Sequence, residues 1–116
     1  MRKVKGRTLC VIQIGTTTKN AIGEAVTEWK DAISFLGVLG LQSGDSKYST
    51  FNAKIEESSH VVVCDFSEYI YSLAGKNTRI IAKGKMYDVL LIDNPDELDE
   101  HLEIYLRHVG GQDVQH

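Results

Sequence analysis

Hydrophobic and polar positions alternate over several short stretches of this 116-residue chain. The runs 8–14 (TLCVIQI) and 59–66 (SHVVVCDF) are rich in β-branched residues, which predicts two strands. Residues 101–107 (HLEIYLR) alternate strictly, with the aliphatic side chains on one face, and predict a closing strand. The pattern therefore predicts a mainly β protein.

Residues 80–92 predict a hairpin that leads into an acidic segment. Two apolar arms flank Lys83-Gly84-Lys85, which we expect to form the turn. Asn94 as a cap and Pro95 at the first helical position predict a helical turn through about Glu100, before the last strand.

Residues 22–36 are ambiguous, because their apolar positions recur at helical spacing. This periodicity predicts a helix over 23–33. The glycines at 37 and 40 would each cost about 1 kcal/mol inside a helix. We therefore expect a buried, kinked strand over 34–41.

The remaining segments are predicted to be connections. Residues 15–23 are polar and lack the glycine and lysine spacing of a phosphate-binding loop, so we expect a long hairpin connection there. Residues 42–47 give a clear loop signal, and 48–59 show no decisive pattern. Five or six strands with one or two short helical pieces predict a small antiparallel barrel or sandwich.

The charge is unevenly distributed along the chain. Residues 1–30 carry six basic and two acidic groups (net +4), whereas residues 88–116 carry one basic and eight acidic groups (net −7). The length predicts one domain. We assign a basic arm to 1–7, the domain to 8–109 and a flexible polar tail to 110–116. No apolar run approaches the roughly 20 residues of a membrane span, and the interrupted apolar run after the basic arm argues against an export signal.

The residue types that carry catalysis lack the required spacing. Cys10 and Cys64 lie in apolar strand-like runs and are predicted to be buried free thiols. A zinc site with His60 and His101 would need a convergence that no local spacing suggests. On one extended strand His60 and Cys64 are about 13 Å apart, too far for a catalytic pair. We therefore expect no catalytic residue, metal or cofactor.

The acidic segment is the strongest candidate for a functional surface. Its carboxylates suit the start of a helical turn but lack the central glycine of a calcium loop, which favours a solvated cap over a cation site. A protein-docking surface is the other alternative. The candidate docking residues are Asp93, Asp96, Glu97, Asp99 and Glu100.

Aromatic residues suggest an alternative function. Tyr48, Phe51, Tyr69, Tyr71 and Tyr105 could form base-stacking platforms on an oligonucleotide-binding type of barrel. The acidic second half of the chain disfavours phosphate binding, so packing is the favoured use. The single tryptophan, at position 29, is expected to be a core or inter-subunit anchor.

A series of landmarks follows in order from about residue 9 to 109. They are Gly23, Trp29, Gly37-Val38-Leu39, Ser43-Gly44, Ser59-His60-Val61, Arg79-Ile80, Gly84, Tyr87, Val89, Ile92-Asp93-Asn94-Pro95 and His101 to Leu106. As an ordered set they make the chain resemble the head–tail adaptor and head-closure (stopper, or head–tail joining) proteins of tailed bacteriophages.

The resemblance implies a small antiparallel β-barrel of five to six strands, with residues 24–41 on a long, kinked strand pair. It implies a structural role without catalysis or cofactor. Copies of the chain, monomeric when free, would form a ring below the portal or adaptor protein. This ring would join the DNA-filled head to a tail-completion protein, and it could close the DNA channel. The expected location is the virion, and the bacterial host cytoplasm during assembly, with no membrane partner.

The resemblance also implies a variable loop at about 43–58 that projects toward the channel. The candidate channel or interface residues in this loop are Ser43, Gly44, Asp45, Lys47, Tyr48 and Phe51. Structural roles fall to Trp29, Gly84, Tyr87 and Pro95.

Overall fold

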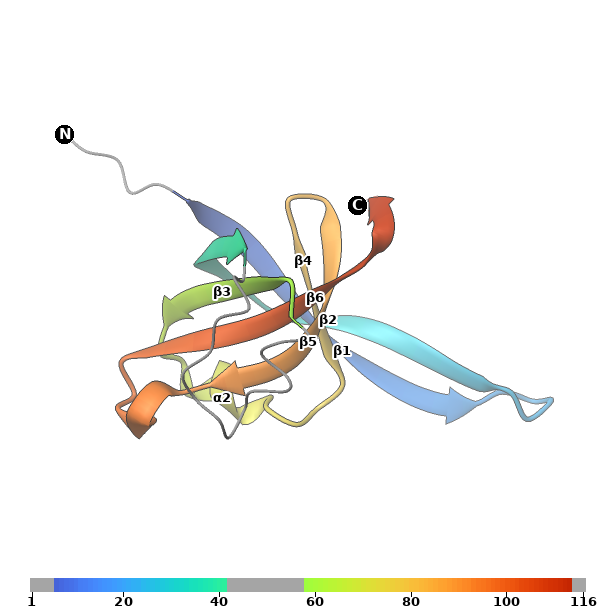
Figure 1. Ribbon diagram of the computed structural model, residues 1–116. Coiled ribbons are helices and arrows are strands. Elements are labelled where there is room, and N and C mark those ends of the chain that lie inside the picture. Colours follow the sequence, from blue (N-terminus) through green and yellow to red (C-terminus); the bar gives the residue numbers. More distant parts are fainter. Residues whose placement is uncertain (1–5, 42–57, 114–116) are drawn as a thin grey trace.

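Six antiparallel strands close into a barrel in the computed structural model, which describes residues 6–41 and 58–113 (Figure 1). The order around the barrel is β1-β2-β3-β6-β5-β4, and β4 pairs again with β1. The predicted mainly β fold is therefore confirmed. The strands are β1 (Arg7–Lys19), β2 (Ala25–Leu41), β3 (His60–Asp65), β4 (Thr78–Ala82), β5 (Lys85–Asp93) and β6 (His101–Asp113).

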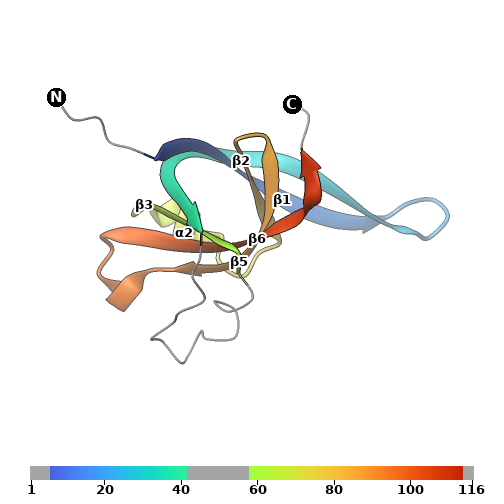
Figure 2. The same cartoon turned by 45° about the horizontal axis from the view of Figure 1, so that its top comes forward.

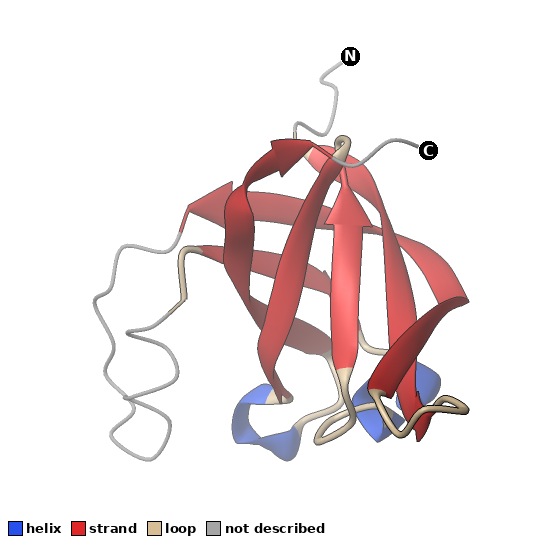
Figure 3. Ribbon diagram, turned by 90° about the vertical axis from the view of Figure 1, so that its right-hand side faces the viewer, coloured by secondary structure: helices blue, strands red, loops and turns tan. Residues whose placement is uncertain are grey.

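The core lies inside the barrel, where alternate residues of every strand meet. The fully buried side chains include Ile12, Val62, Ile80, Leu102, Ile104 and Leu106. The alternation predicted for β6 is thus confirmed. The short helix α2 (Glu68–Ser72) adds Ile70, and the residue after the helix, Leu73, is buried beside it. In Figure 3 the helical segments lie together at one end of the barrel.

The structure contradicts the helix predicted over 23–33 and the loop predicted over 15–23. The first hairpin is instead continuous β structure, with β1 and β2 paired from Arg7–Val38 to Lys19–Ala25. Residues 20–24 alone form the connection. The periodicity misled because a helix would need a surface against which to bury its apolar face. Pairing with β1 supplies the backbone hydrogen bonds instead, and the segment's apolar side chains at Ile22 and Val26 stay exposed.

β2 is one strand of 17 residues, in agreement with the extended structure that the resemblance implied over 24–41, although it is not a strand pair. The register slips between Ile12 and Gln13 of β1, which marks a β-bulge. A bulge increases local twist and bends the strand. Beyond it the hairpin leaves the barrel (Figures 1 and 2).

The β4–β5 hairpin turns at Lys83 and Gly84, both with positive φ (54° and 75°). Two consecutive positive φ values are typical of the type I′ turn that suits the twist of a two-residue hairpin. The predicted turn is confirmed, with Lys85 already the first residue of β5.

Two boundaries differ from the prediction. The helical turn before the last strand is a 3-10 turn, η2 (Pro95–Glu97), and stops short of Glu100, because Asp96 and Glu97 have positive φ and end helical geometry. β6 continues to Asp113, into the predicted tail, because the backbone of Asp113 is paired with Lys85. No helix in the described ranges is long and apolar enough to cross a membrane.

Candidate functional site

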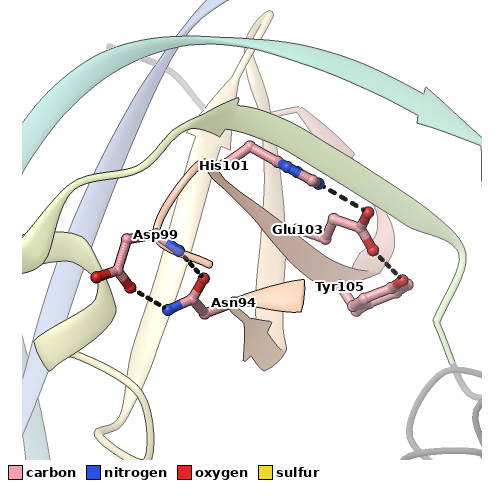
Figure 4. Close-up of polar contacts among 5 residues, drawn as sticks. All are labelled: Asn94, Asp99, His101, Glu103 and Tyr105. Carbon is pink, nitrogen blue, oxygen red and sulfur yellow. Dashed lines mark hydrogen bonds and ion pairs between the residues drawn. The ribbon is translucent and has the colours of Figure 1, made fainter. Parts of the chain in front are cut away.

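The acidic residues that the sequence singled out lie at the turn between β5 and β6. Asn94 is buried there and holds the turn closed, since its Nδ2 donates to Asp99 Oδ1 (2.8 Å) and its Oδ1 accepts from the Asp99 backbone nitrogen (3.1 Å) (Figure 4). Asn94 therefore reaches across the turn and does not cap the helical turn with its side chain as predicted. Asp96, Glu97 and Glu100 remain exposed at this end of the barrel.

Asp93 faces a second carboxylate on the neighbouring strand. It is paired in register with Glu103, which accepts a hydrogen bond from the Tyr105 hydroxyl (2.8 Å) and lies 3.1 Å from His101 Nε2 (Figure 4). Burial raises the pKa of Asp93, and the nearby charges of Glu103 and Asp96 raise it further. Burial, together with a local excess of negative charge, thus disfavours the ionised form of Asp93.

This arrangement does not form a metal centre. Within residues 6–41 and 58–113, no group of three or more histidine, cysteine or acidic side chains is placed to hold a metal ion. The carboxylates instead present a rim of negative charge, which we call the acidic rim: Asp93, Asp96, Glu97, Asp99 and Glu100. Such a rim suits a cationic protein surface.

The candidate channel residues, from Ser43 to Phe51, lie outside the described residues. The residues that were predicted to have structural roles do lie within the described part of the chain. Tyr87 is buried in the barrel wall, and Pro95 begins η2. Among the candidate stacking aromatics, Tyr105 is buried and unsuited to stacking on a base, whereas Tyr69 and Tyr71 of α2 are exposed.

A second candidate surface, which the sequence did not indicate, is the outer part of the β1–β2 hairpin. β1 pairs with β4 only from Cys10 to Ile14, and the Gly15 nitrogen still donates to the Asn77 carbonyl (2.9 Å), so the residues of β1 from Thr16 onward pair with β2 alone. The β1–β2 hairpin extends roughly 15–20 Å beyond the barrel, over the five residue pairs from Gly15–Trp29 to Lys19–Ala25. We call residues 15–29 the ribbon; it is the blue and cyan arm at the right of Figure 1.

A network of side chains from three strands holds the base of the ribbon. Gln13, only 7% exposed, donates to Asp31 Oδ1 (2.8 Å) and accepts from Arg79 Nε (2.8 Å). The Arg79 guanidinium in turn lies over the Trp29 ring, 4.1 Å from its centroid, which is a cation–π contact. Trp29 therefore anchors the ribbon to the barrel. It is half-buried and does not reach the barrel core.

The outer wall of the barrel carries a stripe of exposed aliphatic side chains. Leu9 lies opposite Leu36 in the register of β1 and β2, and Val38 lies opposite Val63 in the register of β2 and β3. All four are exposed, Leu36 by 54%. Contiguous apolar surface of this kind is typical of interaction sites.

A groove adjoins this stripe where β2 and β3 separate. β2 pairs with β3 only from Val38 to Leu41, so its preceding residues have no strand partner on that side within the described chain. The groove has a volume of about 340 Å³. Its lining is mostly apolar, with one charge of each sign: Arg7, Ile33, Phe35, Leu36, Cys64, Asp65, Phe66, Ser67 and Ile70.

The two cysteines are buried, as predicted, and carry no disulfide. Burial raises the pKa of the Cys10 thiol to about 11, and burial together with nearby groups raises that of Cys64 to about 11. Thiols with such values are almost fully protonated near neutral pH, which makes both poor nucleophiles and poor metal ligands.

A cluster of aromatic rings lies where β3, β5 and β6 meet. His60 packs edge-on against Tyr87 with a centroid distance of 4.9 Å, and His108 lies 5.4 Å from the same ring. Burial lowers the pKa of His60, and positive charge on His108 and Lys85 lowers it further. Folding therefore favours the neutral form of the His60 imidazole.

Comparison with known proteins supports the fold and gives no indication of function. No protein-family model matches the chain, and no curated protein matches it. Among solved structures, the solution structure of protein SF1141 from Shigella flexneri 2a aligns over 95% of this chain and 100% of its own, with a TM-score of 0.61 and 17% identity. The two chains share a fold. At this identity the likeness shows the architecture alone.

Proposed function

We propose that this chain is a structural protein of the bacteriophage head–tail connector. Copies of it form a ring below the portal or adaptor protein and join the head to the tail. The ordered landmarks from residue 9 to 109 support this role, and the closed barrel is compatible with it.

The observation that carries the proposal is the ribbon. A monomeric barrel gains little from a two-stranded extension, because an isolated hairpin is marginal in water. Here the extension is well paired, held at its base by Gln13 and Arg79, and exposed over residues 16–28. An arm of this kind suits a protein that reaches a neighbouring subunit.

The acidic rim contributes the second contact in this proposal. It lies at the end of the barrel where α2 and η2 gather (Figure 3), and Figure 1 shows η2 at the lower left, away from the ribbon at the right. Negative charge here favours docking on a basic surface of the tail-completion protein. It also repels the phosphate backbone, so DNA can pass without binding.

The test is to mix the purified chain with portal–adaptor complexes from the same genome and to image them by electron microscopy. We expect an additional ring below the adaptor. If no ring is added, the proposal fails. Salt-dependent binding of single-stranded DNA by the isolated chain would instead support the oligonucleotide-binding alternative.

A second measurement examines the acidic rim. Reversing charge at Asp96 and Glu97 (Asp96→Lys with Glu97→Lys) should leave the ring intact and block addition of the tail-completion protein. Asp88→Lys is the control for charge reversal elsewhere on the barrel; Asp88 is half-exposed, and its reversal also removes the ion pair with Arg107 (3.3 Å). If Asp93, Asp96 and Glu97 instead served an enzyme, their joint replacement by Asn and Gln would abolish an activity and leave assembly unaffected.

A further inference from the structure

The tip of the ribbon is an ordered turn that presents an apolar side chain. Asn20 Oδ1 accepts hydrogen bonds from the backbone nitrogens of Ile22 (3.1 Å) and Glu24 (2.9 Å). Gly23 provides the positive φ (86°) that the turn requires, and its nitrogen donates to the Asn20 carbonyl (3.0 Å). Ile22 stands at the apex and is 78% exposed. A well-bonded turn that holds an aliphatic residue in solvent is a preorganised anchor.

The groove between β2 and β3 offers a site of the right character for such an anchor. Its apolar lining includes Ile33, Phe35 and Leu36, and its volume of about 340 Å³ is near the lower end of the roughly 300–1,000 Å³ of ligand clefts. Leu9, which lies opposite Leu36 and is itself exposed, continues the apolar surface outside the groove.

The charges at the two surfaces are complementary. Lys19 and Glu24 flank the apex of the ribbon, and Arg7 and Asp65 line the groove. Both signs of charge are therefore present on each surface, and in the contact proposed below Lys19 would meet Asp65 and Glu24 would meet Arg7. Pairs of this kind add specificity and orientation to an apolar contact.

The two surfaces lie at opposite ends of the molecule. In Figure 1 the tip of the ribbon is at the far right, and the start of β1, the end of β2 and β3 are at the left. A tip and a groove on opposite sides cannot satisfy each other within one molecule. Two different surfaces that bind each other between copies produce a head-to-tail contact, which forms a ring when the rotation between successive copies closes.

We propose that Ile22 of one copy of this chain seats in the groove of the next copy, with the open edge of β2 alongside. This contact would be the lateral interface of the ring and in that respect rests on the proposed function. Its occupant is a second copy of the same chain.

Disulfide trapping tests the contact directly in the purified chain at high concentration. Ile22→Cys in one preparation and Leu36→Cys in another should cross-link when they are mixed and oxidised. Leu41→Cys is the matched control, because Leu41 is 81% exposed on the same strand but lies outside the groove. Both preparations carry Cys64→Ala, because Cys64 lines the same groove and could pair with the introduced thiol, whereas Cys10 is fully buried. We expect the Ile22–Leu36 pair to cross-link and the Ile22–Leu41 pair to show only background.

Sedimentation measures the same contact without cysteines. Ile22→Ser should weaken self-association about tenfold, the effect of losing one buried anchor worth about 1.4 kcal/mol. Thr18→Ser, in the exposed part of the ribbon, should have no effect. Lys19→Glu and Asp65→Lys should each weaken association, and the double variant should recover part of the loss.

The outcomes separate the two proposals. If rings form on the portal–adaptor complex but Ile22–Leu36 cross-linking is at background, the lateral contact is wrong and the connector function stands. If the pair cross-links in solution but no ring is added to the portal, the contact stands and the connector function is wrong. Unchanged self-association of Ile22→Ser also overturns the contact.

Discussion

Replacing Arg79 with methionine should loosen the ribbon at its base. Methionine keeps an unbranched apolar side chain against Trp29 but removes the guanidinium. The Arg79 hydrogen bond to Gln13 Oε1 (2.8 Å) and the cation–π contact at 4.1 Å are both lost. Gln13 is only 7% exposed, so its carbonyl oxygen has little access to water as a replacement partner.

The expected loss follows from these two contacts. A hydrogen bond to a charged group contributes about 1.5–3 kcal/mol, and Arg79 is partly exposed, which favours the lower end. A partly exposed cation–π contact adds about 0.5–1 kcal/mol. The free energy of unfolding should therefore fall by about 2 kcal/mol. With an unfolding entropy of roughly 2.1 cal/mol/K per residue, this lowers Tm by about 8 °C.

Trp29 makes the assay specific, because it is the single tryptophan of the chain. Urea unfolding followed by far-UV circular dichroism reports the whole barrel, and tryptophan fluorescence reports the base of the ribbon. In Arg79→Met the native emission should shift to the red, and backbone amides of residues 15–29 should exchange faster with deuterium.

Lys30→Met is the control for this prediction. It removes a positive charge from β2, at the exposed position next to Trp29, and should change stability by less than about 0.5 kcal/mol. If Arg79→Met is equally harmless and its emission is unchanged, the network does not hold the ribbon. If both variants lose about 2 kcal/mol, charge alone and not the network accounts for the effect.

Three further predictions concern titratable groups. The pKa of Asp93 is raised in the folded state, mainly by burial and then by Glu103, so Asp93→Asn should stabilise the fold at pH 7 by about 0.5 kcal/mol. In urea titrations this gain in stability should shrink as the pH falls through the raised pKa toward 3.8. A gain that persists at pH 3 would contradict a raised pKa for Asp93. Because the pKa of His60 is lowered, stability should decrease as pH falls below about 6.5, and His60→Asn should remove part of this slope; an unchanged slope would refute it. Cys10 and Cys64 are buried and have thiol pKa values of about 11, so both should resist a thiol reagent at pH 8 until the chain is unfolded. Fast labelling of the native protein would show instead that the barrel opens.

Local patterns predicted the local parts of the fold. The strict alternation of β6 identified Leu102, Ile104 and Leu106 as core residues, and Lys83-Gly84 identified a hairpin turn. Both features depend on residues that are adjacent in the sequence, so short-range chemistry is sufficient to predict them.

The ribbon could not be predicted by the same means. Gln13 reads as a polar interruption of an apolar strand, yet it joins Asp31, 18 residues away, to Arg79, 66 residues away. Hydrogen bonds between residues so far apart leave no periodic trace in the sequence. The groove had no signal either, because it depends on where the pairing of β2 and β3 begins. The acidic rim was visible in the composition, but its geometry depends on the link between Asn94 and Asp99.

The ribbon and the groove are easier to understand together than apart. Left alone, the ribbon exposes Ile22 and Val26 to water, and the barrel exposes Leu9, Leu36 and the open edge of β2. Exposed apolar surface and an unpaired strand edge are both hazards for an isolated protein, because each invites uncontrolled association. Seating the tip of one copy against the groove of the next removes both hazards in a single contact. Two features then fix the position of Ile22 before assembly: the hydrogen-bonded turn at Asn20 and the Arg79 network at the base of the ribbon. Both lower the entropy that is lost on binding.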